Sequence, residues 1–290
     1  MQWDLGIDTL AYPSIKTEIA KKFHFHLSDL LWYDLLVNTM ERKKPQRIIG
    51  IIPARYGSTR FPGKPLAKIS GKSLIQRTYE NARQCSLLQD VIVATDDERI
   101  FQEVLAFNGN AVMTSPTCPT GTERLAEVVK NSGYDDVELM VNIQCDEPLI
   151  KAATLDQVIQ ILQESPEAVM STAAAKITSK EDALDPNTVK CVINVKGEAL
   201  YFSRTLIPNG HQGRWQPHVT YYKHIGVYAY RRQFLMHYPE LAPTSLQMAE
   251  DLEQLKVLEH GYIIKVAVVK DDVVGVDTPE DIRKIESLLT

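Results

Sequence analysis

Residues 51–66 read IIPARYGSTRFPGKPL, an apolar run that leads directly into a loop rich in glycine, proline and basic side chains. The run from Ile48 to Ala54 is short, rich in isoleucine and bounded by proline, which is typical of a buried strand. The prolines and glycines that follow exclude a helix and indicate a shaped loop. A strand with such a loop at its carboxyl end is typical of a parallel α/β sheet, in which ligands bind at that edge.

The rest of the chain after Arg47 continues this alternation. Apolar runs predict further strands at 91–95, 139–143 and 263–269. Helical spacing of apolar residues predicts helices at 74–84, 97–107, 120–129, 152–162, 248–258 and 279–288. Strands that alternate with helices of this length imply βαβ units, and therefore a mostly parallel sheet flanked by helices.

The pattern changes between residues 168 and 230. Four strand-like runs follow one another with few helices between them, at 169–172, 189–195, 199–202 and 225–230. This predicts a smaller antiparallel lobe, which either covers the site or forms a subunit contact.

Residues 1–46 are predicted to be an N-terminal extension of a catalytic domain that spans 47–290. Their most apolar run, 30–37, is interrupted by Asp34 and is shorter than the roughly 20 residues of a membrane span. We expect no signal peptide and no membrane span in this segment. Removal of residues 1–39 is expected to leave activity intact.

The composition excludes several classes of protein. Of 290 residues, 44% are hydrophobic and 24% are charged, as in a globular protein with a buried core. The 32 basic and 37 acidic residues give a net charge of −5, which argues against a nucleic-acid partner. The four cysteines lie far apart without a Cys-x-x-Cys pair, so we expect a reduced, cytoplasmic protein with no zinc knuckle or disulfide scaffold.

Basic side chains gather around the first loop. Between Arg47 and Tyr79 there are seven basic residues and no acidic one. Arginine and lysine bind phosphate, and glycine lets backbone N–H groups approach an anion. The nearby glycine–lysine patterns do not have the spacing or the ending of a P-loop. We interpret the segment as a polyanion-binding loop, with a solvated basic loop as the alternative.

Carboxylates follow two other strands. Asp146 and Glu147 come shortly after the strand that ends at Ile143, and Asp277 precedes a predicted helix. Mg²⁺ on a nucleotide needs only one or two carboxylates, because phosphates and waters supply its other ligands. The pattern therefore indicates a magnesium site, with a simple turn before Pro148 as the alternative for the first two residues.

Two further polar segments have a structural explanation. Thr120 and Glu123 match a capping box, and Asp96 and Asp97 suit the N-terminus of a helix. Neither arrangement needs a ligand.

Taken together, these motifs make the chain resemble the 3-deoxy-D-manno-octulosonate (Kdo) cytidylyltransferases, also called CMP-Kdo synthetases. The resemblance runs collinearly over about residues 48–289. Its motifs are the loop at 51–66, IVATD (92–96), GTERLAE (121–127), VNIQCDEP (141–148), LYFSR (200–204), HIGVY (224–228), LEQL (252–255) and GVDTPED (275–281).

The resemblance implies a Rossmann-like nucleotidyltransferase fold, a homodimer and a set of site residues. It implies that CTP is bound by Arg55, Ser58, Thr59, Arg60, Lys64, Thr120 and Arg124. It implies that Mg²⁺ is held by Asp146 and Asp277, and that these two act in catalysis with Arg60 and Lys64. It implies that Kdo lies against Gln144, Arg204, His224, Tyr228, Glu250 and Glu253.

The implied reaction is CTP + Kdo → CMP-Kdo + pyrophosphate, which supplies lipopolysaccharide assembly. The alternatives are a cytidylyltransferase for another acidic sugar such as sialic acid, a glycosyltransferase that uses a nucleotide sugar, and a non-catalytic nucleotide-binding module. Two positions depart from the family. Cys145 stands where glycine is usual, and Gln247 stands where glutamate is common.

Overall fold

The computed structural model describes residues 47–57, 61–130, 133–211, 213–270 and 274–289. The chain divides after Gln46 into two units, and only the second, 47–290, contains described residues. The predicted N-terminal extension therefore lies outside the described residues. None of the described helices is long and apolar enough to cross a membrane.

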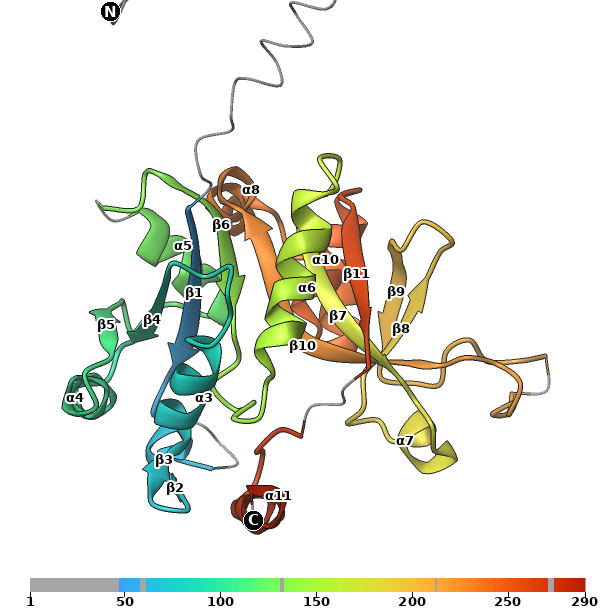
Figure 1. Ribbon diagram of the computed structural model, residues 1–290. Coiled ribbons are helices and arrows are strands. Elements are labelled where there is room, and N and C mark those ends of the chain that lie inside the picture. Colours follow the sequence, from blue (N-terminus) through green and yellow to red (C-terminus); the bar gives the residue numbers. More distant parts are fainter. Residues whose placement is uncertain (1–46, 58–60, 131–132, 212, 271–273, 290) are drawn as a thin grey trace, which may run out of the picture. The chain divides into compact units, whose positions relative to one another are not determined.

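A mixed sheet forms the centre of the described unit (Figure 1), with the strand order β11-β7-β10-β6-β1-β4-β5 and with β8 and β9 attached through β10. The strands are β1 (Arg47–Ala54), β4 (Asp90–Thr95), β5 (Asn110–Met113), β6 (Val137–Asn142), β7 (Met170–Lys176), β8 (Lys190–Ile193), β9 (Ala199–Ser203), β10 (Tyr222–Arg231) and β11 (Ile264–Val269). β10 runs antiparallel to both of its main neighbours, β6 and β7. The other strands of this order run in one direction, which confirms the predicted mostly parallel sheet.

Helices cover both faces of the sheet (Figure 1). One face packs against α3 (Leu74–Ala82), α4 (Glu98–Ala106) and α6 (Ala152–Gln163), and the other against α5 (Gly121–Lys130), α8 (Arg232–His237) and α10 (Glu253–Glu259). Strand β1 shows the physical reason. Ile48 and Ile52 belong to one core while Ile49 and Ile51 belong to the other, because successive side chains of a strand point to opposite faces. A strand buried on both faces reads as a continuous apolar run.

A third, smaller core joins the loop after β1 to the C-terminal segment. It contains Ile69, Leu74, Val276 and Ile285, all fully buried. Its elements are the hairpin of β2 (Lys68–Ile69) and β3 (Lys72–Ser73), the start of α3, and α11 (Pro279–Leu289). This core brings the end of the chain back to the carboxyl edge of β1.

Several sequence-based predictions need correction. The predicted helix at 248–258 is two helices, α9 (Ser245–Glu250) and α10, because Asp251 takes a left-handed conformation with φ of 52°. Strand β5 was not predicted, because it has only four residues and lies at the sheet edge with exposed or half-buried side chains. The loop after β1 contains one 3₁₀ turn, η2 (Lys64–Leu66), although a helix was excluded there.

The expected antiparallel middle section is divided between two places. β7 and β10 lie inside the main sheet, whereas β8 and β9 form an antiparallel extension beside β10. The short helix α7 (Lys180–Leu184) connects β7 to β8, and the 3₁₀ turn η3 (Tyr238–Glu240) follows α8.

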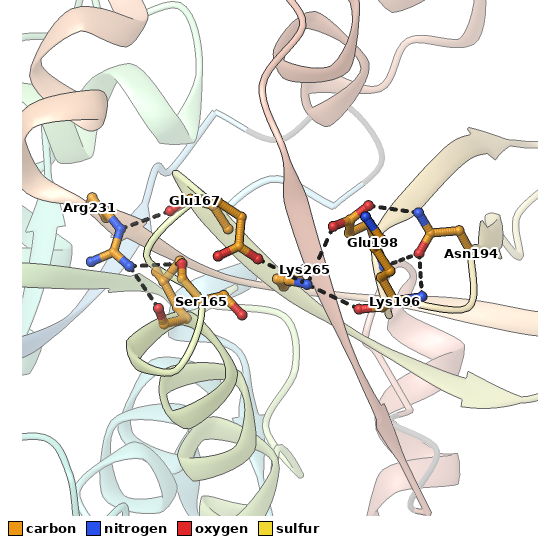
Figure 2. A network of polar contacts seen from close by, with 9 residues as sticks. Ser165, Glu167, Asn194, Lys196, Glu198, Arg231 and Lys265 are labelled. Atoms are coloured by element: carbon orange, nitrogen blue, oxygen red, sulfur yellow. Dashed lines mark hydrogen bonds and ion pairs between the residues drawn. The ribbon is translucent and has the colours of Figure 1, made fainter.

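A polar network ties the turn between β8 and β9 to the edge strand β11 (Figure 2). The Nζ of Lys265 donates to the carbonyl of Lys196 at 3.0 Å and lies 3.1 Å from Glu167 and 3.5 Å from Glu198. Glu198 also accepts a 2.7 Å hydrogen bond from Asn194. One buried ammonium group therefore connects three segments of the unit.

Candidate active site

Lys64 lies between two carboxylates at the carboxyl edge of the sheet. Its Nζ is 2.7 Å from Oδ2 of Asp146 and 3.7 Å from Oδ1 of Asp277, and it donates to the carbonyl of Val276 at 2.9 Å. The Lys64 side chain is 13% exposed, whereas the two carboxylate side chains are 35% and 51% exposed. The structure thus brings together three of the four predicted catalytic residues, and the carboxylates keep one side open to solvent.

The conformation of the loop explains the position of Lys64. Gly63 has φ of 72°, and a Cβ there would lie 3.1 Å from the Tyr56 ring, so the position requires glycine. The N–H of Gly63 donates to the carbonyl of Tyr56 at 2.9 Å, which closes the loop. The guanidinium of Arg99 stacks on the Tyr56 ring at 3.3 Å from its centroid. Lys64 follows as the first residue of the η2 turn.

The third core brings Asp277 to the same place. Val276 is fully buried in that core, and its N–H donates to the carbonyl of Asp146 at 2.8 Å. On the other side, the Asp281 carboxylate accepts from the N–H groups of Asp277 at 3.0 Å and Thr278 at 2.8 Å. The backbone of Asp277 is therefore held on both sides while its carboxylate remains half exposed.

The two carboxylates suit a hard divalent cation that arrives with a nucleotide. Both lie within 3.7 Å of one ammonium group, so they meet at the same point on the edge of the sheet. Across the described part of the chain, no cluster of three or more histidine, cysteine or carboxylate side chains could hold a metal by itself. Two carboxylates with phosphates and waters as the remaining ligands are a common arrangement for Mg²⁺.

Most of the basic residues counted in the sequence are engaged away from this cluster. Ion pairs join Lys68 to Glu103, Lys72 to Glu80 and Arg47 to Asp136, and Arg77 donates to the carbonyl of Ile69. The positive charge is concentrated in the sequence but distributed in space, so most of these basic side chains do not add to the charge beside Lys64.

Among the described basic side chains of this segment, Lys64 and the exposed Arg55 still support the prediction of a polyanion-binding loop. Ser58, Thr59 and Arg60 lie outside the described residues, so their predicted roles in CTP binding stay predictions.

Thr120 and Arg124, which were predicted to bind CTP, lie at the N-terminus of α5. The hydroxyl of Thr120 accepts from the N–H of Glu123 at 3.2 Å, as in the cap expected from the sequence. The hydroxyl of Thr122 donates to Glu253 at 2.6 Å, and burial raises the pKa of the Glu253 carboxyl. Glu253, predicted for Kdo, therefore contacts the helix start that was predicted for CTP.

Arg124 is buried and holds two neighbouring segments together. Its guanidinium lies 2.9 Å from the Asp96 carboxylate and donates to the hydroxyl of Thr114, and the side chain is 4% exposed. Asp96 follows β4, and Thr114 follows β5. Arg124 thus fixes the start of α5 against the carboxyl ends of these two strands.

A cavity of about 410 Å³ lies beside the group formed by Lys64, Asp146 and Asp277. Three residues predicted for Kdo, namely Gln144, His224 and Tyr228, line it together with Asp277. The other lining residues are Glu147, Asn187, Thr188, Val189, Lys223, Gly226, Leu252, Gln254, Gly275 and Asp281. One predicted metal ligand is therefore shared between the cation site and the cavity.

Three residues predicted for Kdo do not line this cavity, namely Arg204, Glu250 and Glu253. The Glu250 carboxylate accepts from the hydroxyl of Ser203 at 2.6 Å and from the N–H of Arg204 at 2.9 Å. The Nε of Arg204 donates to the carbonyl of Glu250 at 2.9 Å. These contacts fasten α9 to the end of β9.

His224 is a neutral side chain in the cavity wall. Burial lowers its pKa to about 3, and its ring packs edge-on against Phe202 at 5.0 Å between centroids. Its Nε2 lies 2.9 Å from the hydroxyl of Thr172. Burial also raises the pKa of the Tyr228 hydroxyl well above its usual value. Both groups therefore offer hydrogen bonds rather than charge at neutral pH.

Gln254 was not predicted as a site residue, although it stands in the LEQL motif that would have indicated it. It is 3% exposed and lines the cavity, and its Oε1 accepts from the Tyr228 hydroxyl at 3.3 Å. Its Nε2 is buried without a hydrogen-bond partner among the described residues. Because a buried unpaired amide is unfavourable, this donor is suited to an acceptor atom on a ligand.

The two departures from the family lie away from the cavity wall. The Cys145 thiol is buried in the core of one face, where burial raises its pKa, and the Cys145 carbonyl accepts from the hydroxyl of Thr78 at 2.9 Å. Gln247 accepts from the N–H of Thr244 at 3.4 Å at the start of α9. Neither side chain lines the cavity.

Comparisons with known proteins agree with this geometry. The sequence pattern of the cytidylyltransferase family matches residues 49–271. A 3-deoxy-manno-octulosonate cytidylyltransferase of Protochlamydia amoebophila is 54% identical over 246 residues, which cover 84% of this chain and 94% of the relative. The mitochondrial enzyme of that name from Arabidopsis thaliana is 49% identical over 250 residues, covering 86% of this chain and 85% of the relative.

A solved structure of CMP:2-keto-3-deoxy-manno-octonic acid synthetase, complexed with CTP, has the same fold. It superposes with a TM-score of 0.78 at 40% identity, and the match covers 84% of this chain and 98% of that one. By its sequence and its fold, this chain belongs to the cytidylyltransferase family, among the 3-deoxy-manno-octulosonate cytidylyltransferases.

Proposed function

We propose that the protein transfers CMP from CTP to Kdo, giving CMP-Kdo and pyrophosphate. The observation that carries this proposal is the position of Asp277, which pairs with Lys64 at 3.7 Å and also lines the 410 Å³ cavity. A nucleotide site and a sugar site that share one carboxylate place the two reacting groups next to each other. The family relationship supports the same reaction.

The chemistry is an in-line displacement at the α-phosphorus. The anomeric hydroxyl oxygen of Kdo forms a bond to that phosphorus, the bond to the β-phosphate oxygen breaks, and pyrophosphate leaves with the electron pair. The hydroxyl proton is released. Negative charge grows on the transferring and leaving groups, so fixed positive charge and correct positioning supply most of the acceleration.

Lys64 is assigned to the triphosphate. Its ammonium is held at 2.7 Å from Asp146 and is largely buried, so it is oriented before substrate binds. A preorganised cation stabilises developing phosphate charge without reorganisation during the reaction. Arg60 is proposed to act on the same phosphates, and Arg55, Ser58, Thr59, Thr120 and Arg124 to complete the CTP site.

Asp146 and Asp277 are proposed to hold Mg²⁺. When bound there, the ion would supply positive charge at the phosphates and lower the pKa of a nearby hydroxyl. The backbones of the two residues are held in place, because the Val276 N–H donates to the Asp146 carbonyl oxygen and the Asp281 carboxylate accepts from the Asp277 N–H.

The cavity is proposed to bind Kdo through neutral hydrogen-bonding groups. Gln144, His224 and Tyr228 line its wall, and the unpaired Gln254 amide adds a donor. A site built to pair with sugar hydroxyl and carboxylate oxygens discriminates against analogues that lack them. Arg204, Glu250 and Glu253 are then assigned to the support of this wall and of the start of α5.

Three wider properties are proposed. Leu200 on β9 and Leu246 and Met248 on α9 are exposed apolar side chains, which supports a homodimer contact on this side. All four cysteines are free thiols, in keeping with a cytoplasmic protein. CMP-Kdo production for lipopolysaccharide assembly follows from the reaction.

The test is pyrophosphate release with Mg²⁺ and purified protein. CTP with Kdo is expected to release pyrophosphate, whereas CTP with sialic acid, and UTP or ATP with Kdo, are expected to release at most a few per cent as much. Release with sialic acid alone would retain the mechanism and replace the sugar. No release with either acid would overturn the proposed function.

A further inference from the structure

Thr172 lies on β7 beneath a bulge in β10. In the pairing of these strands, Ile225 faces Ala173 and Tyr228 faces Thr172, so that Gly226 and Val227 are extra residues on β10. The Thr172 side chain is fully buried at this point. It is therefore in contact only with protein groups, and its hydrogen bonds can be counted.

The Thr172 hydroxyl has three polar neighbours. Its Oγ1 lies 2.8 Å from the carbonyl of Val227, 3.2 Å from the carbonyl of Ile225 and 2.9 Å from Nε2 of His224. Carbonyl oxygens can only accept hydrogen bonds, whereas an imidazole nitrogen either donates or accepts according to its tautomer.

The proton count selects one tautomer of His224. The Thr172 hydroxyl has one proton, and it donates this proton to the carbonyl oxygens of the bulge, which can only accept hydrogen bonds. Oγ1 then presents a lone pair to His224, so Nε2 must carry the imidazole proton and donate it. With the other tautomer, the Thr172 hydroxyl would donate to Nε2, and neither the Ile225 nor the Val227 carbonyl would receive its hydrogen bond.

This choice determines what His224 offers to a ligand. With the proton on Nε2, the other ring nitrogen, Nδ1, is an acceptor. The ring is held between Phe202 at 5.0 Å and Tyr228 at 5.4 Å, and it lines the cavity. A neutral imidazole acceptor complements a hydroxyl group and not a carboxylate.

We propose that Thr172 is a positioning residue, which holds His224 as the Nε2–H tautomer so that its Nδ1 accepts a hydrogen bond from a sugar hydroxyl. The hydroxyl of Thr172 also fixes the bulge that carries Gly226, where a Cβ would lie 3.3 Å from Glu147. The identity of the sugar rests on the proposed function, but the tautomer does not.

The direct test is ¹⁵N NMR of histidine-labelled full-length protein without substrate. The His224 ring signals are assigned by their loss in His224→Gln. The wild-type protein is expected to show Nε2–H and a lone-pair shift at Nδ1. A wild-type spectrum with Nδ1–H would overturn the proposal, and this outcome requires no folded Thr172 variant.

Two substitutions extend the test. Thr172→Ser keeps the hydroxyl and is expected to keep the wild-type tautomer. Thr172→Val has nearly the same shape without the hydroxyl and is expected to shift the population toward Nδ1–H. With CTP saturating, Thr172→Val is expected to raise the KM for Kdo about tenfold and to leave the KM for CTP within about twofold.

The readouts separate this proposal from the proposed function. An unchanged His224 tautomer and unchanged KM for Kdo in folded Thr172→Val would overturn the positioning role. If Kdo is not a substrate at all, the proposed function fails, while the wild-type spectrum still decides the tautomer.

Discussion

The Nζ atom of Lys64 lies 2.7 Å from Oδ2 of Asp146, although 82 residues separate the two in sequence. The pair places a cation and a carboxylate side by side where β1 and β6 end. An incoming triphosphate attracts the first group, and a divalent cation attracts the second. The ion pair therefore holds in place one group for each half of the proposed metal–nucleotide site.

Lys64→Met is expected to lower kcat/KM for CTP about 100-fold, because it removes a fixed positive charge from the growing phosphate charge. The measurement is steady-state pyrophosphate release, with circular dichroism to verify folding. Lys68→Met is the matched control, since Lys68 lies four residues further along, on β2, and pairs with Glu103 on the exposed surface. Equal losses in the two variants would remove Lys64 from the site.

Asp277→Asn is expected to reduce kcat by roughly two to three orders of magnitude, because an amide is a much weaker ligand for Mg²⁺ than a carboxylate. Isothermal titration of Mg²⁺ in the presence of CTP is expected to show weaker binding as well. Glu280→Gln removes an exposed charge from the first turn of α11, which follows Asp277, and serves as the control. Near-normal turnover with unchanged Mg²⁺ affinity in Asp277→Asn would exclude it as a ligand.

Gln254→Leu is expected to raise the KM for Kdo about five- to tenfold, because it removes a buried donor from the cavity wall. The KM for CTP is expected to change by less than about twofold. Gln247→Glu introduces the residue that is common in the family, outside the cavity, and is expected to leave both constants unchanged. A larger effect on CTP than on Kdo would contradict the assignment of this cavity.

Stability is expected to fall on acidification because of His224. Its pKa is about 3 in the folded protein and about 6.5 when unfolded, so between these values the unfolded chain takes up a proton that the folded chain does not. From pH 7 to pH 5 this lowers the free energy of unfolding by about 2 kcal/mol.

The check is urea unfolding at both pH values for the wild type, His224→Asn and His218→Asn. His224→Asn is expected to lose less stability on acidification than the wild type. The exposed His218 is the control and is expected to behave as the wild type does. If all three proteins lose the same free energy, His224 is not neutral in the folded state.

Lys265→Met is expected to lower Tm by about 3 °C at low salt without changing KM for either substrate. The ammonium of Lys265 joins the β8–β9 turn to β11 (Figure 2), away from the cavity-lining residues. Because salt screens its two ion pairs, the difference in Tm should shrink in 1 M NaCl. A loss of activity without a change in Tm would contradict a purely structural role.

Local sequence patterns were sufficient for much of the fold. Apolar runs located β1, β4 and β6, because a strand buried on both faces needs apolar side chains at nearly every position. They could not locate β5, whose edge position leaves its side chains exposed or half-buried. The helical spacing of apolar residues also continued through Asp251, although the left-handed backbone of that residue ends α9 there.

The site divides in the same way. The sequence by itself determined which chemical groups are available, since a glycine- and proline-shaped loop with a lysine, and carboxylates after strands, are local features. Only the tertiary structure decided which of them meet. Val276 and Ile285 are buried with Ile69 and Leu74, and this long-range packing brings Asp277 to Lys64. Glu103 pairs with Lys68, and Glu80 pairs with Lys72. Contacts between residues far apart in the chain depend on the packing of apolar surfaces, which no local pattern encodes.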